Sequence, residues 1–338
     1  MSTISDVLDD VRSQIDADEE ALREARNRLE LVRDAASSYP GALRTYRSGS
    51  LAVHTMLDPV NDGDGGLVLD RRFHQSLGPE GRGELPSDVA SDLQRTIGPT
   101  IRNTYPGARI DMSKRGPFIH FNAPLANGQD PTVDLVIALT RKDGTGLWIP
   151  NLDANKWEPS DPEKHAELLN SGSASYRSIR RRVIRLAKAW NNQFPKPCVS
   201  SFMLSVWALE YVAPGMGVSN GLFALFEGAT MRVANGQSTP DPAGVSKPLK
   251  YLLPDFRVES MLRSATRALE DAFDAGDDEH DVRAALADMY PDYLGDTRQK
   301  SLKTAASTIA RLGTVSAASM GVTGAATAFT PGRSFGGQ

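Results

Sequence analysis

The 338-residue sequence is poor in cysteine and carries no excess of positive charge. Its one cysteine, Cys198, excludes an internal disulfide framework and a cysteine-based zinc cluster. Lys and Arg number 38 against 42 Asp and Glu, which gives a formal charge of −4. This balance argues against a protein that coats long nucleic acid non-specifically, because such binding needs many phosphate contacts from a basic surface. It leaves room for a local basic pocket that binds one nucleotide.

Several familiar patterns are also missing. The N-terminal segment MSTISDVLDD lacks the basic and apolar parts of a signal peptide, and no run is long enough to span a bilayer. We therefore expect a cytoplasmic protein without a membrane segment. The sequence contains no Gly-x-x-x-x-Gly-Lys-Ser/Thr phosphate loop and no dinucleotide-binding glycine pattern after a strand. Hydrophobic residues make up 40% of the chain, enough to bury a sizeable core.

Helical and strand-like segments are unevenly distributed along the chain. Apolar residues at helical spacing predict one long helix over residues 3–38, which ends at Tyr39-Pro40-Gly41. A helix over 87–105 lies among short β-branched or aromatic runs, which predict strands at 67–69, 109–112, 118–121 and 133–139. Later segments predict helices at 177–193, 201–212, 258–275, 281–289 and 297–312. The pattern predicts an α+β fold, with a mixed β-sheet and a long N-terminal helix against a C-terminal helical bundle.

We expect three regions along the chain: a sheet-based domain over residues 1–155, a helical domain over 156–313, and a flexible tail over 314–338. Gly313 is placed to cap the last predicted helix. The tail consists mostly of Ala, Gly, Ser and Thr, which bury too little apolar surface to offset the entropy lost on ordering.

The segment that follows the first helix has the composition of a phosphate and metal site. In a tight turn, Gly49 and Ser50 can present backbone N–H groups and a hydroxyl to phosphate oxygens. Asp62 and Asp64 point to the same side of a strand, because strand side chains alternate with period two. Asp134 lies in an apolar run, where a charge is costly unless it is paired or bound to metal. Such hard oxygen ligands suit Mg²⁺, which binds a few carboxylates together with substrate phosphates.

Simpler interpretations exist for each of these residues. Asp-Gly-Asp-Gly-Gly by itself is typical of a turn. A calcium loop fits poorly, because the twelfth position counted from Asp62 is Phe73 and not a bidentate glutamate. Arginines in the 177–188 segment predict a solvated basic face. Lys188 lies off the apolar stripe of the same helix, so it can face a cleft and bind phosphate.

Taken in order, Gly49-Ser50, Asp62-x-Asp64 and the strand-borne Asp134 resemble the DNA polymerase β-like nucleotidyltransferase superfamily. The helical half is similar to the bacterial CD-NTases, the cGAS/DncV-like nucleotidyltransferases of antiphage signalling. The resemblance runs from about residue 3 to 312 and also rests on the segments 157–165, 185–191 and 200–202. Gly65-Gly66 departs from the pattern, since many members have a bulkier residue there, and predicts a loosened start of the strand.

The resemblance implies a role for each matching residue. The sheet-based domain would be the nucleotidyltransferase core and the helical domain the nucleotide- and substrate-binding domain. Asp62, Asp64 and Asp134 would be the catalytic carboxylates and would hold Mg²⁺, with Mn²⁺ as an alternative. The remaining matches would bind the nucleotide: Gly49 and Ser50 the donor triphosphate, Lys188 the β- or γ-phosphate, Ser201 through its hydroxyl, and Phe202 by stacking on the base.

The implied activity is synthesis of a cyclic oligonucleotide second messenger in antiphage (CBASS) defence. Its partners would be nucleoside triphosphates, ATP and also GTP or others, with no membrane and no long nucleic acid. An operon-encoded regulatory partner acting on the glycine-rich tail is a further implied partner. Two alternatives remain: linear addition of nucleotides to RNA, a protein or a small molecule, and a non-catalytic nucleotide-sensing scaffold. Three converging carboxylates argue against the scaffold, which has no need of them.

Overall fold

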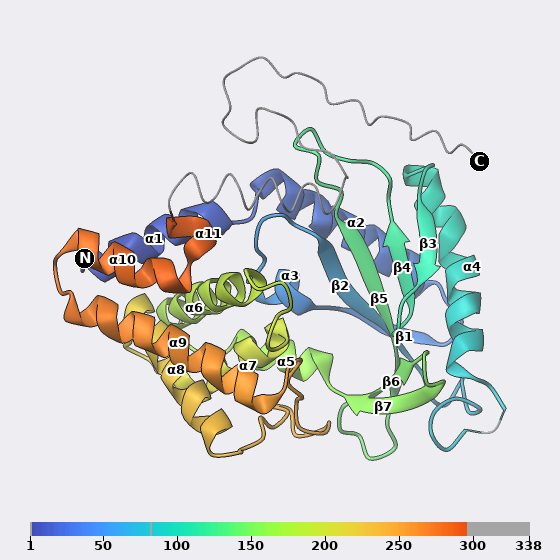
Figure 1. The fold of residues 1–338 in the computed structure, drawn as a ribbon. Helices are drawn as coiled ribbons and strands as arrows, with labels where there is room; N and C mark the ends of the chain where they lie inside the picture. The colour runs from blue at the N-terminus through green and yellow to red at the C-terminus, as the bar shows by residue number, and fades with distance from the viewer. Residues whose placement is uncertain (1, 82, 296–338) are drawn as a thin grey trace, which may run out of the picture.

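The computed structural model describes residues 2–81 and 83–295. A seven-stranded sheet occupies one half of this part of the chain and a group of helices occupies the other half (Figure 1). This arrangement confirms the predicted α+β class with a mixed sheet and a C-terminal helical half. The predicted helix 297–312, its cap at Gly313 and the predicted tail 314–338 lie outside the described residues.

The sheet has the order β1-β2-β5-β4-β3, with β6 beside β5 and β7 beside β6. Its strands are β1 (Ala42–Ser48), β2 (Asp62–Leu69), β3 (Arg109–Met112), β4 (Pro117–His120), β5 (Thr132–Thr140), β6 (Leu147–Asn151) and β7 (Lys156–Ser160). Strands β2 and β5 pair in parallel, whereas the other pairs are antiparallel. The parallel register sets Asp64 directly opposite Asp134.

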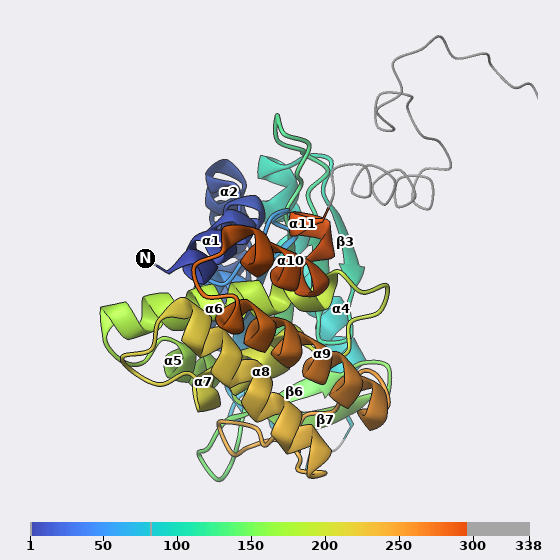
Figure 2. The same ribbon diagram turned by 60° about the vertical axis from the view of Figure 1, so that its left-hand side comes forward.

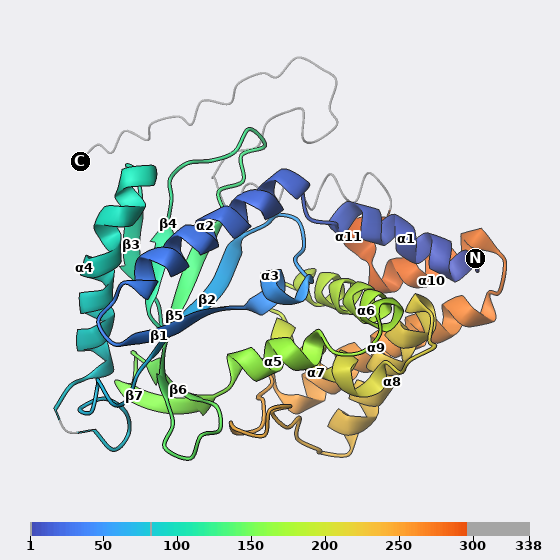
Figure 3. The ribbon, with the colours of Figure 1, turned by 180° about the vertical axis from the view of Figure 1, so that it is seen from behind.

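The helices α2 (Glu19–Ser37) and α4 (Pro86–Thr104) cover one face of the sheet and share a hydrophobic core with it (Figure 3). Leu29 of α2 lies over β2, where a Cβ atom added at Gly65 would come within 2.8 Å of its side chain and one at Gly63 within 3.4 Å. Because strand side chains alternate, Asp62 and Asp64 point to the opposite face, away from α2.

The N-terminal region forms two helices and not the single predicted helix. Helix α1 (Thr3–Ile15) ends at Asp16, and Asp18 caps α2 by accepting a hydrogen bond of 2.8 Å from the backbone N–H of Ala21. The break allows the two helices to pack into different hydrophobic cores. The apolar face of α1 belongs to the core of the helical half, whereas that of α2 belongs to the core under the sheet.

The helices of the other half lie together (Figure 2). They share one large apolar core, which includes Trp190, Trp207 and Phe226. The helices of this half after the sheet are α5 (Pro162–Leu169), α6 (Ala174–Asn192), α7 (Ser201–Tyr211), α8 (Val218–Ala234), α9 (Asp255–Asp274), α10 (Glu279–Met289) and α11 (Pro291–Leu294). The sequence did not predict α8, which contains two glycines. Each glycine allows a neighbouring side chain to pack closely: Gly228 lies under the ring of Tyr211, and Gly221 packs against Val183 and Val212.

Three strands and one expectation about β2 also differ from the sequence analysis. The prediction omitted β1, β6 and β7, and the expected domain boundary at residues 155/156 falls inside the β6–β7 hairpin. Gly65-Gly66 does not loosen β2, which runs without interruption from Asp62 to Leu69. Instead, Gly66 makes room for a neighbouring side chain, because a Cβ atom there would meet the ring of Tyr46 at 2.1 Å.

Of the helices in the described ranges, none combines the length and apolar character needed to span a bilayer.

Candidate functional site

A cavity of about 250 Å³ lies between the sheet and the helical half. Residues from both halves line it: Ser48, Gly49, Ser50, Val53, Thr55, Asp64, Pro162, His165, Ala166, Leu169, Lys188, Ser201, Phe202 and Ser205. The five residues predicted to bind a nucleotide are all among them, together with one of the three predicted metal ligands. We call the strand and α3 side the sheet wall and the α5, α6 and α7 side the helical wall.

The three predicted metal ligands come together on adjacent strands of the sheet wall. Asp62 and Asp64 lie two residues apart on β2, and Asp134 is the β5 partner of Asp64. All three side chains are half-buried. Burial and the charges of Asp62 and Asp134 raise the pKa of Asp64 to about 7, and burial also raises the pKa of Asp62 and of Asp134. Like charges crowded in a low-dielectric site favour the neutral form, and a bound cation relieves that cost.

Gly49 begins the short helix α3 (Gly49–Val53), where the sequence predicted a tight turn. Its φ of +63° lies in the left-handed region that favours glycine. A Cβ atom at this position would lie 1.8 Å from Oδ2 of Asp64. The backbone therefore comes close to the carboxylates only because the residue has no side chain. Ser50, the next residue, lines the same cavity as Asp64.

Lys188 crosses from the helical half to the sheet wall. Its Nζ atom donates hydrogen bonds to Oγ of Ser50 at 2.8 Å and to the carbonyl of Thr55 at 2.9 Å. The side chain is buried, and burial lowers its pKa to about 8, against the raising effect of Asp62 and Asp64. Two acceptors leave the ammonium group one of its three N–H donors for a ligand in the cavity. Lys188 thus leaves the apolar stripe of α6, as its spacing predicted.

Ser201 and Phe202 lie at the start of α7 on the helical wall. Ser200 caps this helix by accepting a hydrogen bond from the backbone N–H of Met203 at 3.2 Å. The Phe202 ring lies 4.7 Å from the ring of His165, with the two planes tilted by 45°. A flat apolar ring beside a polar aromatic ring is suited to contact the face of a nucleobase.

The pair of His165 and Asp241 was not predicted from the sequence. Nε2 of His165 donates a hydrogen bond to the buried carboxylate of Asp241, which also accepts from the backbone N–H of Ser246 at 2.7 Å. Burial opposes ionisation of Asp241, but the hydrogen bonds from Ser246 and His165 hold its pKa below the usual range. An ionised carboxylate only accepts, so Nε2 carries the proton, and Nδ1 of a neutral ring is left as an acceptor.

Ser113 was not predicted either. Its Oγ donates a hydrogen bond of 2.9 Å to Oδ1 of Asp134, and its backbone N–H donates to the carbonyl of Gly116 in the β3–β4 turn. Partners of this kind orient a metal-binding carboxylate. No sequence signal identifies this serine, because only the pairing of β3, β4 and β5 brings it to Asp134.

The carboxylate set fits a hard divalent cation, because it offers oxygen ligands on one face of two paired strands, beside a cavity that also contains Ser50 and Lys188. Among the described residues, three ligand atoms all within 4.8 Å of one another occur at Asp278, His280 and Asp281, which are exposed and lie at the start of α10. Asp62, Asp64 and Asp134 do not form such a tight group of three, although Asp64 and Asp134 are direct partners across β2 and β5.

Comparison with solved structures shows the fold. The chain is similar to the CD-NTase CdnG of Bradyrhizobium diazoefficiens in complex with GTP, at 16% identity and a TM-score of 0.63 over 89% of this chain and 98% of that one. It is also similar to CdnC of E. coli MS115-1 with ATP, at 16% identity and a TM-score of 0.60 over 87% and 97%. A further match is the Vibrio cholerae cyclic AMP-GMP synthase DncV with a linear intermediate, at 15% identity and a TM-score of 0.56 over 86% and 87%.

No protein-family model and no curated protein matches the sequence. The chain has the fold of the CD-NTases over nearly the full length of the first two solved structures.

Proposed function

We propose that this chain, which has the CD-NTase fold, is a nucleotidyltransferase that joins nucleoside triphosphates into a cyclic oligonucleotide. The observation that carries the proposal is the meeting of Asp64, Ser50 and Lys188 in one cavity between the two halves. Carboxylates for a cation, a hydroxyl and an ammonium group for phosphates are the groups that pyrophosphate-releasing nucleotidyl transfer requires.

Each wall has its own task in this proposal. The donor triphosphate lies along Gly49, Ser50 and Lys188, where the third N–H of the Lys188 ammonium group meets the β- or γ-phosphate. Asp62, Asp64 and Asp134 would hold one or two divalent cations, Mg²⁺ or Mn²⁺. When bound, such ions would supply the positive charge that neutralises the α-phosphate and the leaving pyrophosphate. A ribose hydroxyl then attacks the α-phosphorus, so that one P–O bond forms, the bond to pyrophosphate breaks, and the hydroxyl proton is released.

The helical wall orients the nucleoside. Phe202 contacts the face of the donor base and Ser201 contributes a hydroxyl. Repetition of the transfer and ring closure yields a cyclic product, which we propose serves as a second messenger in antiphage defence. The solved CdnG, CdnC and DncV structures of the same fold hold GTP, ATP and a linear intermediate, respectively. The supply of nucleoside triphosphates also favours action in the cytoplasm.

Incubation with labelled ATP, GTP, CTP and UTP tests this function. Purified protein is given each nucleotide and their mixture with Mg²⁺ or Mn²⁺, and the products are treated with phosphatase and analysed by mass spectrometry. The proposal predicts a phosphatase-resistant product whose mass equals that of whole nucleotide units without terminal phosphate. A ladder or a labelled macromolecule supports linear addition instead. Absence of any product with all four nucleotides, from protein that binds them, supports the sensing scaffold.

A further inference from the structure

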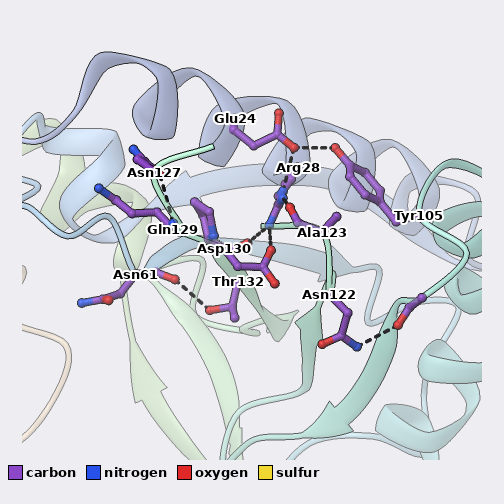
Figure 4. A network of polar contacts seen from close by, with 12 residues as sticks. Glu24, Arg28, Asn61, Tyr105, Asn122, Ala123, Asn127, Gln129, Asp130 and Thr132 are labelled. Atoms are coloured by element: carbon purple, nitrogen blue, oxygen red, sulfur yellow. Dashed lines mark hydrogen bonds and ion pairs between the residues drawn. The ribbon is translucent and has the colours of Figure 1, made fainter. Parts of the chain in front are cut away.

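A fully buried arginine, Arg28, lies on α2 behind the two strands that carry the carboxylates. Its side chain is 1% exposed, and its guanidinium carbon lies 4.7 Å from the centre of the Phe121 ring and 5.3 Å from that of Tyr105. Figure 4 shows this group reaching from α2 toward the segment that connects β4 to β5. A charge buried this deeply is costly unless several acceptors share it.

Four acceptors on three segments share the Arg28 charge. Its Nε donates to Glu24 at 2.8 Å, and Nη2 donates to the carbonyl of Ala123 at 2.6 Å. The other terminal nitrogen, Nη1, forms an ion pair with Asp130 and donates to the carbonyl of Pro131 at 2.7 Å. The guanidinium group therefore holds both ends of the connection between residues 123 and 131 against α2.

The same connection also fixes the start of β2. Asn61, the residue before Asp62, accepts hydrogen bonds at its carbonyl from N and Oγ1 of Thr132, at 2.8 and 3.0 Å (Figure 4). Gln129 accepts from the backbone N–H of Val60 at 2.7 Å and donates to Asp58 at 2.9 Å. These bonds tie the chain just before Asp62 to the chain just before Asp134.

We propose that Arg28 is a positioning residue for the carboxylate site. It holds Pro131 three residues before Asp134, and through Thr132 and Asn61 it sets the offset of β5 against β2, and so the separation of Asp134 from Asp62 and Asp64. Ions held between two strands respond to small changes in that separation, since Mg²⁺ demands near-ideal geometry. The inference rests on the proposed function, because it assumes that the carboxylates bind metal.

Mn²⁺ binding by the full chain, followed through the electron paramagnetic resonance signal of free Mn²⁺, is the test. In Arg28→Lys the charge stays, but an ammonium group cannot reach four acceptors in a forked arrangement. We expect the dissociation constant for Mn²⁺ to rise about tenfold, the scale seen for partners behind metal ligands. Asp62→Asn with Asp64→Asn gives the background of binding elsewhere on the protein.

Arg180 offers a matched control. It is also 1% exposed, donates to the carbonyls of Leu169 and Ser171 at 2.7 and 2.9 Å, and lies 4.7 Å from the centre of the Tyr176 ring, all in the helical half. Arg180→Lys should lower the melting temperature as Arg28→Lys does, yet leave the affinity for Mn²⁺ at the wild-type value. If both variants weaken Mn²⁺ binding equally, general destabilisation explains the effect and the inference is wrong.

A milder variant keeps the test decisive if Arg28→Lys does not fold. Thr132→Val removes the hydrogen bond from Oγ1 to the carbonyl of Asn61, which is the link between the two strands in this proposal, and should weaken Mn²⁺ binding about threefold, less than Arg28→Lys. Wild-type affinity in this variant would then overturn the inference while the metal site stands. Wild-type protein that binds Mn²⁺ no better than the double aspartate variant overturns the metal site itself, and with it the proposed function.

Discussion

The two walls of the cavity hold their side chains in different ways. On the sheet wall, Asp62, Asp64 and Asp134 stand on neighbouring strands, and burial raises the pKa of each. On the helical wall, Lys188 and His165 each have a defined hydrogen-bond partner, Ser50 and Asp241. On the sheet wall, the crowded carboxylates carry an electrostatic cost that a bound cation would relieve. On the helical wall, hydrogen bonds hold Lys188 and His165 in position, and each side chain still has one group left for a ligand. We therefore expect changes to the sheet wall to act on the chemical step and changes to the helical wall to act on binding.

The largest expected effect comes from the sheet wall. Asp62→Asn together with Asp64→Asn should lower product formation at least about a thousandfold, since the site loses several kcal/mol of charge stabilisation. The protein should remain folded, because the substitutions remove repulsion and leave the shape of the side chains. Product formation and circular dichroism are measured on the same sample. Undiminished synthesis in the presence of Mg²⁺ would contradict this metal site.

Lys188→Ala tests the helical wall and should chiefly weaken nucleotide binding. Loss of a charge-assisted hydrogen bond to phosphate costs about 1.5–3 kcal/mol, measured by calorimetry with a non-hydrolysable triphosphate. Arg177→Ala is the control, because Arg177 lies on the same helix but is half-exposed and bonds to the carbonyl of Gly172. Equal losses in the two variants would mean that the face of α6 acts only through its general charge.

The cost of ionising the buried carboxylates of the sheet wall should also make the free energy of unfolding depend on pH. Without metal, the folded state keeps the Asp64 proton up to a pKa of about 7, whereas the unfolded chain loses it at the ordinary aspartate pKa of 3.8. The free energy of unfolding should therefore fall as the pH rises between these values. At pH 8, Asp64→Asn should be more stable than wild type by about 1–3 kcal/mol, and the gain should vanish near pH 4. A variant without this gain at pH 8 would show that Asp64 stores no such cost.

The smallest expected effect concerns the contacts of the helical wall with the nucleobase. His165→Ala removes an acceptor and a ring contact beside Phe202, and should raise the KM for the nucleoside triphosphate about fivefold, near 1 kcal/mol, with a smaller change in kcat. His165→Phe keeps the ring contact and loses only the nitrogens. A full return to the wild-type KM in His165→Phe would mean that the hydrogen bond to Asp241 has no role in binding.

The difference between the walls also explains what the sequence could reveal. The strand alternation that places Asp62 and Asp64 on one face is local, and the charge of Asp134 is conspicuous in an apolar run. Lys188 is likewise visible as a departure from the stripe of α6. The carboxylate of Asp241, however, lies 76 residues from His165, and Ser113 reaches Asp134 only through strand pairing. Contacts made by tertiary structure alone leave no periodic signal.

The same reasoning applies to the fold. The break between α1 and α2 has no proline or glycine to mark it, and it is decided by the two separate cores on which the helices pack. Strand β7 contains Pro159, which lowers its apparent strand character, yet an edge strand tolerates a proline. Helix α8 contains two glycines, which disfavour a helix in the sequence but allow Tyr211 and Val183 to pack closely against it in the structure. The sequence predicted the α+β class and most of the helices. Tertiary packing determined the break between α1 and α2, strand β7 and helix α8.

A crystal structure with Mn²⁺ and a non-hydrolysable ATP analogue would show whether this cavity is the site of nucleotidyl transfer. We expect anomalous scattering from Mn²⁺ at metal-ligand distance from the carboxylates of Asp62, Asp64 and Asp134. We also expect the triphosphate beside Gly49, Ser50 and Lys188, with the nucleobase near Phe202. Nucleotide bound elsewhere on the protein, or Mn²⁺ found only at sites away from these three carboxylates, would contradict the proposed site.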